Sequence, residues 1–134
     1  LQKLLFEIYK AKKLLSNNVS PIEKLILELR NNIGKWWTVK ELADLSNMSI
    51  IRIRNLFVEY TGTTPKNYIE KLKMQRAIEM LSSEKTSINV IADSLGYMDP
   101  YHFSRRFKHI IGISPDSYRK NVIRIDLKRN KNST

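Results

Sequence analysis

The chain repeats itself after about fifty residues, and this repeat restricts the fold more than any other feature of the sequence. Residues 38–68 read TVKELADLSNMSIIRIRNLFVEYTGTTPKNY, and residues 87–118 read SINVIADSLGYMDPYHFSRRFKHIIGISPDSY, with one extra residue in the second turn. The alignment pairs Ala43 with Ala92, Asp44 with Asp93, Phe57 with Phe107, Gly62 with Gly112, Pro65 with Pro115, and Tyr68 with Tyr118. Each copy predicts a short helix, a tight turn and a second helix, which is the arrangement of a helix-turn-helix unit.

Prolines and glycines mark where the helices begin and end. Each proline follows a residue that can cap a helix, which gives the pairs Ser20-Pro21, Thr64-Pro65, Asp99-Pro100 and Ser114-Pro115. The glycines at 34, 62, 96 and 112 each follow an apolar helical pattern, where a left-handed residue ends a helix. No proline or glycine interrupts a periodic segment, so the sequence predicts an all-α protein.

These marks and the 3.6-residue periodicity predict the domain organisation. Helices are expected at 1–16, 21–32, 39–46, 50–61, 65–82, 88–95, 100–111 and 115–121. Two helix-turn-helix subdomains, 19–64 and 83–121, are joined by a long linker helix at 65–82. Residues 1–18 are predicted to form an N-terminal linker or a dimerisation helix, and residues 122–134 a basic flexible tail. Because the chain begins with Leu1 rather than Met, we expect it to be a piece of a longer protein.

The charge and composition of the chain restrict the kinds of partner that it can bind. It has 24 Lys and Arg against 13 Asp and Glu, a formal charge of +11, which favours polyanionic partners. It has no cysteine, which excludes thiol catalysis, disulfides and thiolate metal sites. No apolar run approaches the ~20 residues that a membrane span needs, so no membrane partner is predicted.

The second helix of each repeat, at about 50–60 and 100–110, divides into an apolar side and a polar side. The side chains predicted to face inward are Ile53, Leu56, Phe57 and Tyr60 in the first copy, and Phe103, Phe107 and Ile110 in the second. The side chains predicted to face outward are Ile51, Arg52 and Asn55 in the first copy, with Arg54 on the flank, and Tyr101, His102 and Arg105 in the second, with Ser104 on the flank. Together these are called the eight outward residues. Arg106 stands where the first copy has Leu56, so we expect its stem on the core edge and its guanidinium outward.

Outward side chains on the first turns of such a helix reach base edges in a major groove. Arginine can bind guanine, asparagine can bind adenine, and an aliphatic group can contact a thymine methyl. The eight outward residues are therefore the candidate base-reading residues. The candidate phosphate contacts are Ser49, Lys73, Arg106 and Lys108. A linker helix roughly 27 Å long, at ~1.5 Å per residue, can hold two reading helices about one duplex turn apart, ~34 Å.

A run of residues at fixed spacing extends across the second half of the chain. It consists of Lys73-Met74, Ala77, Leu81, Ile91-Ala92, Gly96-Tyr97, Phe103, Phe107, Gly112 and Ser114-Pro115. Together with the first repeat, this run resembles the AraC/XylS family of bacterial transcription regulators over about residues 20 to 120. The resemblance implies a two-lobed helical domain that binds double-stranded DNA and reads it through the eight outward residues. It also implies RNA polymerase as a partner, a homodimer formed through an N-terminal region, no cofactor, no metal, and a cytoplasmic location at the nucleoid.

Other functions fit the sequence less well. A module for anionic membrane surfaces would need a helix with a broad free apolar face, and only residues 1–16 could supply one. An enzyme would need a nucleophile or a metal cluster, and the chain has neither cysteine nor a Ser/His/Asp arrangement, so no catalysis is predicted. RNA binding usually relies on aromatic stacking on open sheets or loops, which the sequence does not predict.

Several remaining residues have a structural interpretation. Trp36 and Trp37 precede the predicted cap at Thr38, so one of them is expected to pack on the core. His102 and His109 are seven residues apart without further ligands, so no metal site is predicted. Four carboxylates are interpreted as solvated helix charges: Glu41, Asp44, Glu70 and Glu79. Three further residues are interpreted as part of the buried stripe of the linker helix or its core: Tyr68, Met74 and Met80.

Overall fold

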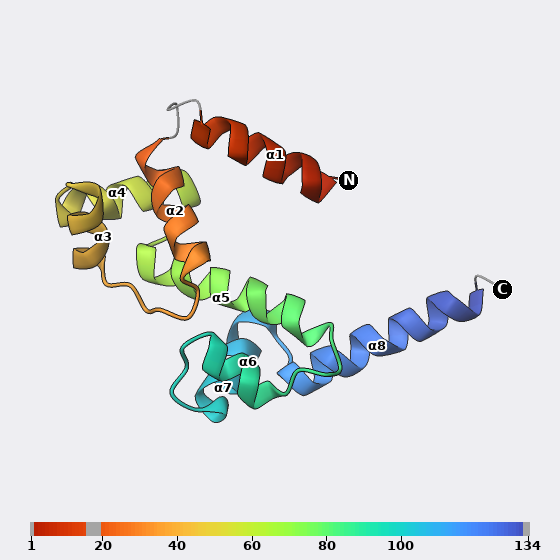
Figure 1. Ribbon diagram of the computed structural model, residues 1–134. Helices are drawn as coiled ribbons and strands as arrows, with labels where there is room; N and C mark the ends of the chain where they lie inside the picture. The colour runs from red at the N-terminus through yellow and green to blue at the C-terminus, as the bar shows by residue number, and fades with distance from the viewer. Residues whose placement is uncertain (1, 16–19, 133–134) are drawn as a thin grey trace.

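The computed structural model describes residues 2–15 and 20–132, and every regular element in these ranges is an α-helix. The helices are α1 (Gln2–Leu15), α2 (Pro21–Asn31), α3 (Val39–Ser46), α4 (Ile50–Thr61), α5 (Pro65–Leu81), α6 (Ile88–Ser94), α7 (Pro100–Ile111) and α8 (Pro115–Asn132) (Figure 1). The predicted all-α class is confirmed, and α2 to α7 begin and end within a residue or two of the predicted bounds.

The predicted caps explain why the helices start where they do. At Ser20, Thr64 and Asp99 the side chain accepts a hydrogen bond from the backbone N–H three residues later, and a proline follows at the first helical position. Thr38 and Glu41 form a capping box at the start of α3. Gly62 and Gly112 end α4 and α7 in the left-handed conformation, with φ of 80° and 100°.

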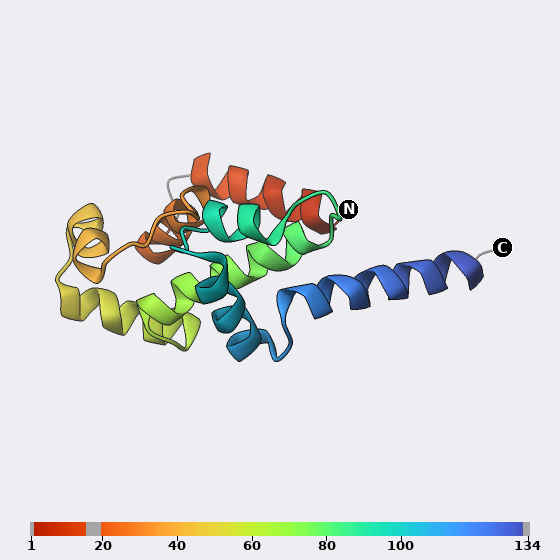
Figure 2. The same cartoon turned by 90° about the horizontal axis from the view of Figure 1, so that it is seen from below.

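The helices pack around two separate cores that share one helix. Helices α2, α3 and α4 form the first lobe, whose core centres on Leu42, Ile53 and Phe57. Helices α6 and α7, with the start of α8, form the second lobe, whose core centres on Phe103 and Phe107. The N-terminal half of α5 packs into the first core and its C-terminal half into the second. Helix α5 therefore connects the two lobes, as the repeat predicted (Figures 1 and 2).

Helix α8 is longer than the sequence indicated. The chain after residue 121 was expected to be a flexible tail, but the helix continues to Asn132, and residues 133–134 lie outside the described part. No proline or glycine follows Pro115, and the sequence up to residue 132 is rich in lysine and arginine, which favour helix. The extension projects away from both lobes (Figures 1 and 2).

The inward stripes of α4 and α7 are shorter than predicted. Ile53, Phe57, Phe103 and Phe107 are fully buried, as expected. Tyr60 is 56% exposed and its hydroxyl donates to Glu23 at 3.5 Å, so its inward placement is wrong. Ile110 is 39% exposed and is a second such error. Both residues stand in the last turn of their helices, and in α7 it is the neighbouring Ile111 that packs against the second core.

Candidate nucleic-acid interface

The predicted reading residues lie on the open faces of α4 and α7. Ile51 is 70% exposed and Tyr101 is 74% exposed, while Ser104 is half-buried. The remaining members of the set are exposed: Arg52, Arg54, Asn55, His102 and Arg105. Since Ile53 and Phe103 between them are fully buried, each helix presents one side to its core and the other to the surroundings.

The caps of these two helices fix where the reading residues start. The Ser49 hydroxyl accepts the Arg52 N–H at 3.1 Å, and the Asp99 carboxylate accepts the His102 N–H at 2.7 Å. The first outward side chains therefore stand in the first turn of each helix, the part that reaches base edges in helix-turn-helix proteins. Ser49 is exposed, and its hydroxyl hydrogen is still available to a phosphate oxygen.

An aromatic cluster supports the second reading helix from beneath. The rings of Tyr97 and His102 meet edge to face, with centroids 5.5 Å apart, and Tyr97 also contacts Phe103 at 5.3 Å. The Tyr97 hydroxyl donates to Glu70 of α5 at 3.4 Å. Burial, together with the neighbouring Glu70 carboxylate, raises the pKa of Tyr97 well above its ordinary value, so the phenol remains a hydrogen-bond donor. The outward His102 ring thus rests on a packed and hydrogen-bonded base.

Arg106 does not point outward as predicted. Its guanidinium donates through Nε to Glu70 at 3.0 Å and forms an ion pair with the same carboxylate. The hydrogen bond to Glu70 raises the pKa of Arg106 further. Glu70 is half-buried between α5 and α7, so its interpretation as a solvated charge is also wrong. This pair braces the second reading helix against the linker helix.

Lys73 is the clearest error among the candidate phosphate contacts. The residue is fully buried, and its ammonium donates to the backbone carbonyls of Ile33, Lys35 (3.1 Å) and Leu95 (2.7 Å). It has no surface to offer a phosphate. The sequence held a signal for this placement, because Lys73 stands four residues after Ile69 and four before Ala77, both of which are buried.

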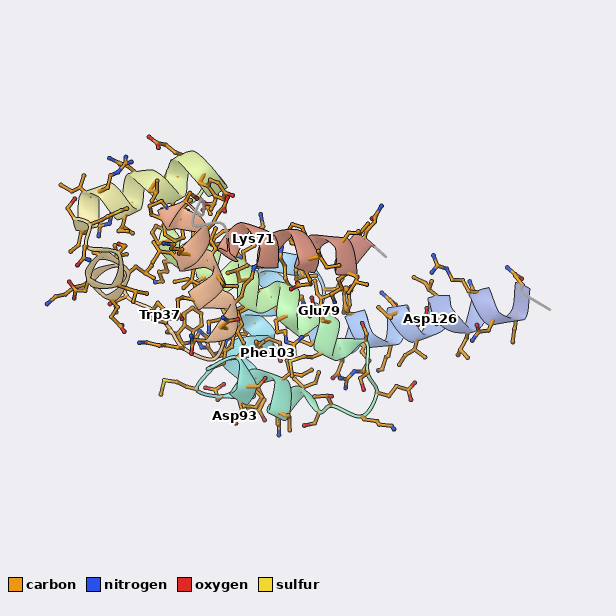
Figure 3. All side chains as sticks on the ribbon, turned by 45° about the horizontal axis from the view of Figure 1, so that its top comes forward. Trp37, Lys71, Glu79, Asp93, Phe103 and Asp126 are labelled. Atoms are coloured by element: carbon orange, nitrogen blue, oxygen red, sulfur yellow. The ribbon has the colours of Figure 1, made fainter. Side chains whose placement is uncertain are left out.

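The tandem tryptophans have different roles. Trp37 packs against the first core, so the prediction that one of the pair packs on the core is confirmed (Figure 3). Trp36 instead reaches the second lobe: its indole N–H donates to the Gly96 carbonyl at 2.8 Å, and its ring meets Tyr97 edge to face at 5.3 Å. Sequence reasoning missed this contact, which spans sixty residues of chain.

Metal-ligand clusters and membrane-spanning helices are absent from the part of the chain that the structure describes. Within residues 2–15 and 20–132, no group of three or more His, Cys, Asp or Glu could hold a metal ion. None of the helices in the same ranges is long and apolar enough to cross a membrane. Lys108, the last candidate phosphate contact, is exposed on α7.

Comparisons with known proteins agree with this architecture. Residues 42–121 match the protein family described as "Helix-turn-helix domain". The chain is 37% identical over 101 residues to the uncharacterized HTH-type transcriptional regulator YidL of Escherichia coli, covering 75% of this chain and 34% of that protein. It is 38% identical over 89 residues to the transcriptional activator RclR of the same species, covering 66% of this chain and 31% of that protein. The chain spans about a third of the length of these curated relatives.

Solved structures show the same fold. A transcriptional regulator from Chromobacterium violaceum, described as AraC-type, superposes with a TM-score of 0.68 at 26% identity, covering 72% of this chain and 87% of that chain. The DNA-binding domain of AdpA, solved with a target DNA, superposes with a TM-score of 0.71 and covers 77% of this chain and 93% of that chain. At 21% identity, this similarity shows a shared fold. The repeated helix-turn-helix lobes, the linker helix that they share and these similarities lead to one conclusion: the chain belongs to the AraC family of helix-turn-helix transcription regulators.

Proposed function

We propose that the chain reads a specific sequence of double-stranded DNA by placing the opening turns of α4 and α7 in successive major grooves. The observation behind this proposal is the matched division of the two helices. In each, the first two turns after the cap expose arginine side chains, Arg52 and Arg54 in α4 and Arg105 in α7. The opposite side of each helix is buried, through Ile53 and Phe57 in α4 and Phe103 and Phe107 in α7. Helix α5 has 17 residues, about 25 Å at ~1.5 Å per residue, which suits reading helices roughly one duplex turn apart.

The candidate residues divide into two roles. Those proposed to contact base edges are Ile51, Arg52, Arg54, Asn55, Tyr101, His102, Ser104 and Arg105. Ser49 and Lys108 are proposed to bind phosphate, which sets register without reading sequence. Lys73 and Arg106 are assigned to the protein interior and to the Glu70 ion pair instead. Much of the affinity comes from phosphate neutralisation by a chain of formal charge +11, so binding weakens steeply with salt.

The complete regulator is proposed to act at the nucleoid as an activator that recruits RNA polymerase. A homodimer through the N-terminal region is a further part of this proposal. Helix α1 supports it, because Leu4, Leu5, Phe6 and Ile8 are each between 45% and 63% exposed and so are free to pair with a second apolar helix.

One selection experiment tests DNA reading. Duplexes are selected from a random pool with the 134-residue chain, and the enriched sequences are expected to contain two different blocks about one helical turn apart. Arg52→Ala with Arg54→Ala should relax the first block only, and His102→Ala with Arg105→Ala the second only, so each lobe is the control for the other. Enrichment of no block, or equal effects of both double variants on one block, would contradict the proposal.

A further inference from the structure

The two lobes touch directly, beside the linker helix that both share. On the first-lobe side the contact is made by residues 33–36, which follow α2, and on the second-lobe side by residues 94–97, the last residue of α6 and the turn after it. Lys73 of α5 lies between them. We call this set of residues the lobe junction.

Lys73 binds both sides of the junction at once. Its ammonium has three hydrogens and donates to three carbonyls, those of Ile33 and Lys35 in the first lobe and that of Leu95 in the second. The Nζ atom also lies 4.4 Å from the centre of the Trp36 ring, in cation–π contact. Leu95 is the C-cap residue of α6, so its carbonyl lies at the negative end of that helix and suits a cation. A buried charge is tolerated because all of its donors are used.

The backbones of the two turns also meet without side chains between them. Gly96 has φ of 82°, and a Cβ atom there would lie 2.1 Å from the Gly34 carbonyl oxygen. A Cβ atom at Gly34 would lie 2.9 Å from the Ser94 carbonyl oxygen. Trp36 closes the same contact from the side, through its hydrogen bond to the Gly96 carbonyl. Only glycines allow the turns this close.

The junction limits a motion that the cores leave open. Each core packs against one half of α5, and sliding of these side chains would let the first lobe roll about the axis of α5. The second lobe is already braced on α5 by the Arg106–Glu70 ion pair. Direct bonds between the lobes oppose such a roll, because Lys73 would lose the carbonyls of one lobe. The directions of α4 and α7 relative to each other are then fixed together with their separation.

We propose that Lys73 is a positioning residue that sets the mutual orientation of the two reading helices and thereby the spacing of the DNA blocks that the protein accepts. The part concerning DNA rests on the proposed function. Lys73 itself does not touch DNA, because it is fully buried. It acts through the turns that lead into α3 and α7, and so through the placement of both reading faces.

A distance measurement tests the junction without DNA. The chain has no cysteine, so Glu59→Cys on α4 and His109→Cys on α7, both exposed, give two unique sites for spin labels. We expect a narrow distance distribution for the parent and a clearly broader or shifted one for Lys73→Met. Lys71→Met, the same change at an exposed site of the same helix (Figure 3), is the matched control and should leave the distribution unchanged. A distribution for Lys73→Met identical to that of the parent would overturn the proposal.

Binding to duplexes of altered spacing tests the consequence. With the two selected blocks moved apart or together by one base pair, the parent should lose at least about tenfold in affinity. For Lys73→Met the same shift should cost less than about threefold, while affinity for the original spacing falls and the preferred bases within each block stay the same. Equal spacing penalties in parent and variant refute the role of Lys73 even where the distances change.

Two further variants keep the outcome interpretable. Trp36→Phe removes only the indole donor to Gly96 and should show the same effects more weakly, so it decides the question where Lys73→Met does not fold. Lys73→Cys, alkylated with bromoethylamine in denaturant and refolded, restores an ammonium of nearly the same length and should restore the parent's spacing penalty. If the parent enriches no two-block sequence, the proposed function fails. The distance measurement still tests whether Lys73 fixes the orientation of α4 relative to α7.

Discussion

Replacing Gly96 by alanine should destabilise the protein far more than the same change at Gly62, although the two backbones are nearly alike. Their φ angles are 82° and 80°, so alanine meets the same left-handed strain at both sites. That strain costs about 1–2 kcal/mol and is partly offset by ~0.4–1 kcal/mol from the less flexible unfolded chain, so Gly62→Ala should lose roughly 1 kcal/mol. The sites differ in their surroundings, because nothing lies within 4 Å of a Cβ atom at Gly62.

At Gly96 the added carbon would lie 2.1 Å from the Gly34 oxygen, whereas ordinary contact begins at 3.4 Å. Backbone must therefore shift, and overpacking of this kind adds about 1–3 kcal/mol, for a total loss of about 2–4 kcal/mol. Urea unfolding followed by circular dichroism gives both free energies of unfolding, and Gly112→Ala, with φ of 100° and open surroundings, is a second control. If all three variants lose the same free energy, the lobes do not meet at Gly96 and the reasoning is refuted.

Other predictions concern DNA binding and pH. Arg105→Ala should cost about 1–3 kcal/mol and relax one base position in duplex titrations, and an unchanged preference would remove Arg105 from the reading residues. Lys108→Ala should weaken all duplexes alike and reduce the salt slope by about 1, and a changed base preference would contradict its phosphate role. The hydrogen bond from Lys35 helps to hold the pKa of Glu41 below its ordinary 4.5. The ionised Glu41 carboxylate therefore stabilises the fold above pH 4.5, and this stabilisation is lost as the pH falls through the lowered pKa. Urea unfolding between pH 3 and pH 7 should therefore show a smaller acid loss for Glu41→Gln than for the parent. Burial lowers the pKa of Lys73 to about 8 from 10.5, so between pH 8 and pH 10.5 the unfolded chain holds a proton that the folded chain has released. As the pH rises through this range, the free energy of unfolding of the parent should increase relative to that of Lys73→Met. An NMR titration of the Lys73 Cε resonance should show its midpoint near pH 8, and a midpoint near 10.5 would contradict the shift.

The features that the sequence predicted well are local ones. Caps such as Asp99 and terminating glycines such as Gly62 act within a few residues, so their effect on helix bounds can be read from neighbouring letters. The division of α4 and α7 into two faces is equally local, because helical periodicity alone separates Phe103 from His102. The repeat then indicated that both lobes share one plan.

The errors arise where distant parts of the chain meet. Lys73 was interpreted as a surface cation because lysine is rarely buried, and the three carbonyls that receive it come from turns 22 to 40 residues away. The outward placement of Arg106 followed from its position in the repeat alone, and its partner Glu70 lies 36 residues earlier in the chain, beyond the reach of any local pattern. The lobe contact through Trp36 was missed for the same reason. No periodicity or capping rule encodes such pairings, because they depend on how the lobes pack together.

The exposed faces of α4 and α7 have an evolutionary consequence. Side chains such as Ile51, Arg52, Tyr101 and Arg105 contribute little to either core, and exchanges at such surface positions usually change stability by no more than ±0.5 kcal/mol. Under the proposed function, a descendant of this chain can therefore acquire a new target sequence through a few codon changes without loss of a stable fold. Substitutions at Gly34, Gly96 and Lys73 are not tolerated in this way, because these residues hold the two lobes together. Over long divergence, the relative placement of α4 and α7 should therefore change less than the DNA sequence that the protein binds.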